Sequence, residues 1–91
     1  MTEKGIYFVR ALSAVNDRYY FMGNNGKWLD TTAVSELREY KTMNGAKRFV
    51  LKQYLSNVRK YDVVFVPYGQ HYNIVYLEKE AKVVFTKEMN K

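Results

Sequence analysis

The sequence of 91 residues contains no cysteine, one proline and one histidine. Without cysteine the chain has neither a disulfide framework nor a thiolate metal site, as expected for a protein of the reducing cytoplasm. His71 is the only imidazole that a catalytic base or a metal site would have, and the nine acidic residues are scattered. We therefore expect no enzymatic activity, no cofactor and no metal site.

Phosphate-binding motifs and long apolar runs are also missing. The stretch GNNGK at 23–27 has the spacing of a hairpin turn and not that of a phosphate-binding loop. The first apolar run is interrupted by Arg10 and Ser13, unlike the core of a secretory signal. No window approaches the roughly 20 apolar residues that span a bilayer. These features predict a cytoplasmic protein with no membrane partner.

The composition is that of a folded domain. Hydrophobic residues make up 47% of the chain and aromatic residues 16%, which is too rich for a disordered protein. Two domains in a chain of this length would each be too small to stabilise a core. Residues 1–91 are therefore predicted to form a single domain.

Runs of β-branched and aromatic residues, separated by turn residues, predict strands on both sides of one helix. Residues 33–42 fit either a helical turn or a short edge strand, and we favour a turn followed by a short extended piece. The predicted fold is α+β: an antiparallel sheet of two β-meanders with one main helix on one face, in the order β-β-β-α-β-β-β. The predicted strands span residues 6–12, 18–22, 27–29, 61–68, 72–78 and 82–87.

The predicted helix begins at a capping residue between Thr42 and Asn44 and continues to about Val58. Successive residues turn by about 100° around a helix, which makes this segment amphipathic. Its apolar half would hold Ala46, Val50, Leu51, Tyr54, Leu55 and Val58, and its opposite half a stripe of Arg48, Lys52 and Arg59.

The excess positive charge is local. Residues 38–60 contain seven basic residues and one acid, so this stretch carries a net charge of +6, equal to that of the whole chain. Such a cluster favours an acidic macromolecule as partner, either a protein, a nucleoprotein or a nucleic acid, although a helix face that only contacts water explains it equally well. Phosphate contacts would be made by Arg48, Lys52, Arg59 and Lys60, with Lys41 and Lys47 at the edges of the stripe.

Aromatic residues are the second candidate feature. Phe49 lies beside the basic stripe, where it would either stack on an unpaired base or reach into the core. Tyr19 and Tyr20 are adjacent on a predicted strand, so they point to opposite faces and cannot both enter the core of a one-sided sheet. Exposed tyrosines are typical anchors of protein interfaces.

Residues 5–55 resemble small uncharacterised accessory proteins encoded by phages and mobile elements of Gram-positive bacteria. The resemblance is carried by IYFVR, YYFMGNNGKWLD, Tyr40 and NGAKRFVLKQYL. It implies a compact α+β accessory protein that engages host machinery, and it implies no catalytic residues.

The predicted function is non-enzymatic binding to a host protein or nucleoprotein through the basic helix and exposed aromatics. The first alternative is direct nucleic-acid binding through the basic helix face. A further alternative is a homo-oligomer whose sheet edges pair. The sequence leaves the oligomeric state open.

Overall fold

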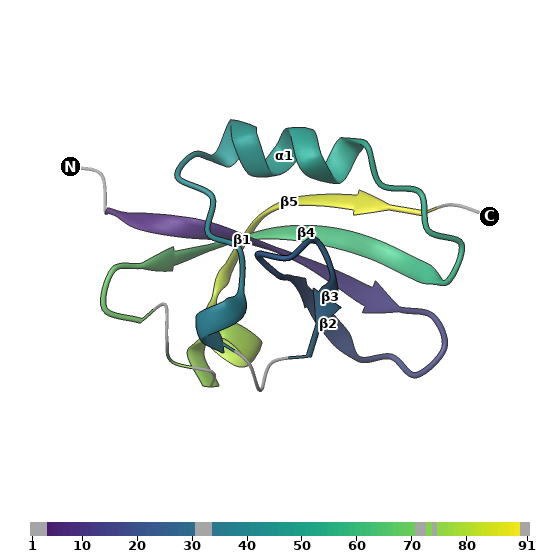
Figure 1. Ribbon diagram of the computed structural model, residues 1–91, viewed down its shortest axis with the longest axis horizontal. Coiled ribbons are helices and arrows are strands. Elements are labelled where there is room, and N and C mark those ends of the chain that lie inside the picture. Colours follow the sequence, from purple (N-terminus) through teal and green to yellow (C-terminus); the bar gives the residue numbers. More distant parts are fainter. Residues whose placement is uncertain (1–3, 31–33, 71–72, 74, 90–91) are drawn as a thin grey trace.

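The computed structural model describes residues 4–30, 34–70, 73 and 75–89. Its centre is an antiparallel sheet of five strands in the spatial order β3-β2-β1-β4-β5. The helix α1 (Met43–Leu51) lies along one face of this sheet (Figure 1). The predicted α+β class and the packing of one main helix on an antiparallel sheet are therefore confirmed. The strands are β1 (Gly5–Ser13), β2 (Tyr19–Met22), β3 (Trp28–Leu29), β4 (Val58–Pro67) and β5 (Lys82–Glu88).

The N-terminal meander forms as the turn residues predict. The Gly23 N–H donates to the Lys27 carbonyl at 2.8 Å, and Gly26 has a φ of +79°, which glycine adopts without strain. After β3, η1 (Val34–Glu36) is a single 3₁₀ turn. An extended piece follows, in which Tyr40 pairs with Tyr7 of β1. A turn followed by an extended piece is thus confirmed for the described residues of this segment.

The sheet carries buried side chains on both faces, and β4 shows this most clearly. Val63 faces α1 and Val64 faces the opposite side, and both are fully buried. On the face opposite α1, Leu37 follows η1 and Leu77 lies in η2 (Tyr76–Glu80), a single π-helical turn. This second layer explains why β4 has a continuous apolar sequence and not an alternating one.

Two β-bulges change which side chains face α1. In the pairing of β1 with β4, Arg59 has no opposite residue, so Val58 and Tyr61 both join the core beneath α1. In the pairing of β4 with β5, Val84 has no opposite residue. The bulge at Arg59 places its side chain outside the regular alternation of the strand.

The predicted strand at 72–78 is wrong where the structure describes it, because η2 replaces its second half. The Asn73 side chain accepts a hydrogen bond from the Tyr76 N–H at 3.2 Å, and its carbonyl accepts one from the Leu77 N–H at 3.0 Å. These bonds close a helical turn and bury Leu77 under the sheet. His71, Tyr72 and Ile74 lie outside the described residues. The final predicted strand is confirmed as β5.

The predicted extent of the helix is also wrong: α1 ends at Leu51, seven residues before Val58. Its start is confirmed, since the Thr42 hydroxyl caps the Gly45 N–H at 3.1 Å. At the other end, the Lys52 and Gln53 N–H groups turn back to the Phe49 and Val50 carbonyls, as in a tightened last turn. Helical periodicity did not predict this C-terminal end, because the other hydrogen-bond partners of the last residues come from the sheet.

Candidate protein-binding surface

The segment that follows α1 is held by two side chains of the sheet. The Lys87 ammonium on β5 donates to the Leu51 carbonyl at 3.2 Å and to the Gln53 carbonyl at 2.9 Å. A cation at this position also interacts favourably with the negative, C-terminal end of the helix dipole. The Leu55 N–H donates to the Tyr61 hydroxyl of β4 at 3.1 Å. The last residue of α1 and residues 52–55, which lie outside regular structure, are therefore fixed.

This fixed segment presents apolar side chains to solvent. Leu51, Tyr54 and Leu55 are 45%, 73% and 42% exposed, whereas the helix prediction placed all three in the core. The Lys87 ammonium lies 3.8 Å from the centroid of the Tyr54 ring, within cation–π range. The α1 C-terminal patch, as we name it, consists of Leu51, Tyr54, Leu55, Arg48, Lys52 and Lys87.

The basic stripe predicted from helical periodicity is shorter than expected. Arg48 and Lys52 are exposed on α1 and at its C-cap, and Lys41 is exposed just before the helix. Lys47 is half-buried, with its ammonium 4.9 Å from the centroid of the Phe85 ring. Arg59 and Lys60 do not belong to the helix, because both lie in β4.

These two β4 cations lie outside the predicted stripe. The Arg59 guanidinium lies 3.1 Å from the Asp17 carboxylate in the loop between β1 and β2. Lys60 pairs in register with Leu12 and Glu88, which places it on the face opposite α1. The structure therefore separates Lys60 from Arg48 and Lys52.

The predicted aromatic anchors are mostly packed. Phe49 contacts Trp28 and Tyr40, with ring centroids 6.4 and 6.1 Å apart, so its side chain belongs to the core beneath α1. Tyr19 and Tyr20 do point to opposite faces, but both are half-buried because both faces are covered. The exposed tyrosine of this region is Tyr54. The turn formers Ser56 and Asn57 were the signal in the sequence that the helix ends before them.

A pocket of about 380 Å³ lies next to the α1 C-terminal patch, on the α1 face of the sheet. Its walls come from β1, the β1–β2 loop, β2, the start of β3, the connection between α1 and β4, and the first residue of β4. Leu55 belongs to both the pocket and the patch. Sequence reasoning missed this pocket, because it assigned residues 55–58 to a helix. The lining residues are Ala11, Ser13, Val15, Asn16, Tyr20, Trp28, Leu55, Asn57 and Val58.

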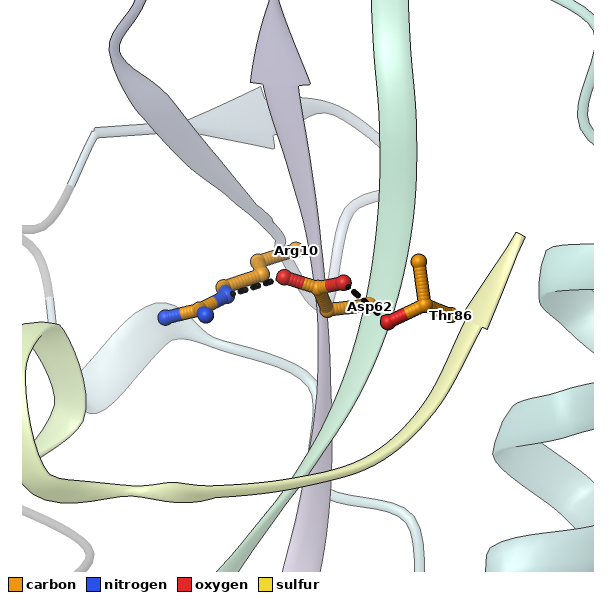
Figure 2. A network of polar contacts seen from close by, with 3 residues as sticks. All are labelled: Arg10, Asp62 and Thr86. Carbon is orange, nitrogen blue, oxygen red and sulfur yellow. Dashed lines mark hydrogen bonds and ion pairs between the residues drawn. The ribbon is translucent and has the colours of Figure 1, made fainter. Parts of the chain in front are cut away.

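A polar network crosses the opposite face of the sheet (Figure 2). Asp62 of β4 is fully buried and accepts a hydrogen bond from Arg10 Nε of β1 at 2.9 Å. The Thr86 hydroxyl of β5 donates to the other Asp62 carboxylate oxygen at 2.7 Å. The Arg10 guanidinium lies over the Tyr19 ring, 4.0 Å from its centroid. The network joins three neighbouring strands at a single register.

The described residues contain neither a cluster of metal-ligating side chains nor a helix that could span a membrane. Within residues 4–30, 34–70, 73 and 75–89, no group of three or more histidine, cysteine or acidic residues could hold a metal ion. The helices in this part of the chain are too short or too polar to cross a membrane.

Comparisons with protein-family models, with curated proteins and with solved structures gave no match.

Replacing Tyr61 with Phe tests the hydrogen bond that holds the segment after α1. The variant leaves the Leu55 N–H without its partner, which we expect to reduce the free energy of unfolding by about 1–2 kcal/mol at neutral pH. Urea denaturation checks this, with Tyr54→Phe as the control because the Tyr54 side chain is largely exposed. Equal stability of the two variants would contradict the role given to the Tyr61 hydroxyl.

The same variant alters the alkaline pH dependence. Burial raises the pKa of Tyr61 above its ordinary value of about 10, opposed by the smaller effect of the Leu55 N–H bond. Because the folded-state pKa is the higher one, the stabilisation from neutral Tyr61 is fully present below pH about 10 and is lost as the pH rises through the folded-state pKa. We expect Tyr61→Phe to lose less stability than the unsubstituted protein over this range.

Proposed function

We propose that this chain is a non-enzymatic binding protein that docks on an acidic surface of another protein through the α1 C-terminal patch. The observation that supports this is the exposure of Leu51, Tyr54 and Leu55 on a segment that Lys87 and Tyr61 hold in place. Exposed apolar groups that are already ordered lose little conformational entropy on binding.

The charge around the patch favours an acidic partner. The patch contains three basic residues and no acid, and Lys41 is exposed just before the same helix. Arg48, Lys52 and Lys87 would steer an acidic surface toward the patch, while Tyr54 and the two leucines supply the apolar contact. By the resemblance described above, the partner would be a bacterial host protein, and the cytoplasmic location expected from the sequence is part of this proposal.

The geometry favours a protein over a nucleic acid. A phosphate-binding row needs several free cations on one face, and Arg59 lies against Asp17 while Lys60 lies on the other side of the sheet. Phe49 packs against Trp28 and Tyr40, which removes the candidate for base stacking. Aliphatic Leu51 and Leu55 suit an apolar protein contact better than a phosphate backbone.

Charge reversal within the patch tests the proposal. We expect Arg48→Glu with Lys52→Glu to weaken capture of a partner protein from a Gram-positive bacterial lysate by about ten-fold or more, because both favourable charges become repulsive. The matched control is Lys4→Glu with Lys79→Glu, which changes the net charge equally at exposed positions outside the patch. Captured proteins are identified and quantified by mass spectrometry.

If the partner is a nucleic acid, the patch variant and the control variant should differ in binding to labelled DNA or RNA. Fluorescence anisotropy with labelled single- and double-stranded DNA and RNA is measured at low and near-physiological salt. Binding that falls steeply with salt and disappears in the patch variant would overturn the protein partner in favour of a nucleic acid. Equal capture by the patch variant and the control would overturn the patch itself.

A further inference from the structure

We propose that the pocket beside the α1 C-terminal patch receives one apolar or aromatic side chain from an acidic peptide segment of the partner. This inference rests on the proposed function and specifies what the partner presents. It also specifies where the main anchor is buried, namely between the β1–β2 loop and the connection from α1 to β4.

The chemistry of the pocket suits a side chain of this kind. Val15, Leu55 and Val58 supply aliphatic walls and Trp28 an aromatic one. The pocket volume of about 380 Å³ is near the lower end of the range for ligand sites, which is about 300–1,000 Å³. An anchor in a pocket, surrounded by weaker contacts that exclude water, is the usual arrangement of a binding hot spot. Neutral hydrogen-bonding groups at Ser13, Asn16, Tyr20 and Asn57 complete the lining.

The mouth of the pocket is apolar and open. Val15 is 79% exposed, and Leu55 continues from the pocket into the patch. A partner that covers the patch would therefore also reach the pocket. Burying both residues would remove apolar surface from water on the side where the cations already attract the partner.

The two loops that form the mouth are joined to each other. The Ala14 N–H donates to the Asn57 carbonyl at 2.8 Å, and the Arg59 guanidinium lies 3.1 Å from the Asp17 carboxylate. Where β1 meets the β1–β2 loop, the Ser13 hydroxyl accepts a hydrogen bond from the Val15 N–H at 3.1 Å. These contacts pre-form the pocket, which reduces the entropy cost of binding.

The charges around the pocket select the residues that flank the anchor. Lys52 of the patch precedes the lining segment 55–58 in the sequence, whereas Arg59, which follows that segment, is paired with Asp17 of the opposite loop. The charges of Asp17 and Arg59 offset each other, so the net positive charge beside the pocket comes from the patch. Aspartate or glutamate next to the anchor, on the side that covers the patch, would therefore be attracted, and lysine or arginine repelled.

Trp28 provides a direct readout, because it is the only tryptophan and lines the pocket. The probe is a synthetic peptide of aspartate, glutamate, serine and glycine with one central phenylalanine. We expect it to change the Trp28 emission saturably. The same peptide with a central alanine should bind about ten-fold more weakly or worse, as should a peptide with lysine in place of its acids.

Variants of the pocket complete the test. Val15→Ser and Leu55→Ser should each weaken binding of the phenylalanine peptide several-fold. Val83→Ser is the matched control, because Val83 is 43% exposed, close to the 42% of Leu55, and lies on β5 outside the pocket. Circular dichroism establishes that each variant is folded.

Failure of the pocket and failure of the proposed function give different results. Equal binding of the phenylalanine and alanine peptides, or no binding of either, would overturn the pocket as an anchor site. Capture of the partner protein through Arg48 and Lys52 would then still support the proposed function. Equal binding of the acidic and lysine peptides would overturn the acidic character of the segment.

Discussion

Replacement of Asp62 with Ala is expected to destabilise the fold by about 3–5 kcal/mol, the cost of leaving a buried charge without its partner. Arg10 is 8% exposed, and its guanidinium would lose the carboxylate that now lies 2.9 Å away. Since a domain of this size has a total stability of about 5–10 kcal/mol, a large fraction of the molecules would unfold at a low concentration of denaturant. Urea denaturation followed by circular dichroism measures the loss.

Two further variants separate the ion pair from its surroundings. Thr86→Val removes one hydrogen bond to the buried Asp62 carboxylate and is expected to cost about 1.5–3 kcal/mol, less than the loss of the ion pair. The double variant Arg10→Met with Asp62→Leu removes both charges together, and we expect it to recover most of the stability lost in Asp62→Ala. A double variant as unstable as the single one would show that the charges themselves are needed.

Replacement of Leu77 with Ala is expected to cost about 2–5 kcal/mol, the range for truncating a fully buried leucine. Leu77 packs from η2 onto the sheet face opposite α1, beside Phe8 and Val64. The variant therefore tests whether this short turn is part of the core. Thermal and urea denaturation, with hydrogen exchange at β4, provide the measurement.

The control for Leu77 comes from the same segment. Val75→Ala shortens a side chain that is 52% exposed, and we expect an effect within about 0.5 kcal/mol. If Leu77→Ala were equally mild, η2 would not be a layer of the core. The face opposite α1 would then resemble the one-sided sheet that the sequence suggested.

The sequence predicted elements whose determinants are local. The GNNG turn requires positive φ, and the strands around it follow from β-branched and aromatic runs. The same holds for β5 and for the cap at Thr42. These features depend on neighbouring residues alone, so the amino-acid sequence is enough to locate them.

The sequence could not predict elements that depend on distant partners. Ser56 and Asn57 indicate only that the helix ends before them, whereas its last carbonyl and the segment after it are held by Lys87 and Tyr61, which lie in strands that follow the helix. Without these bonds, helical periodicity extends naturally to Val58. The helix prediction therefore placed Leu51, Tyr54 and Leu55 in the core, although all three are exposed. For the same reason it predicted neither the patch nor the pocket.

The second error had a similar origin. The stretch YNIVYLE has the composition of a strand, yet Leu77 is buried by a helical turn that Asn73 closes. This turn covers the apolar sheet face opposite α1. That face forms only when β1 and β4 pair, so the residues of the turn do not encode it by themselves. The position of Arg59 depends in the same way on a bulge in that pairing.

The unpaired Val84 of β5 affects whether two copies of this protein can pair through the edges of their sheets. The strand β5 is an edge of the sheet, where an incoming strand from a second copy would form new backbone hydrogen bonds. Lys82 pairs with Phe65 on the α1 side, whereas Glu88 pairs with Lys60 on the opposite side, although a regular strand would place both on one side. An incoming strand with regular alternation cannot match this broken alternation along its whole length, and the bulge therefore acts against strand addition at this edge.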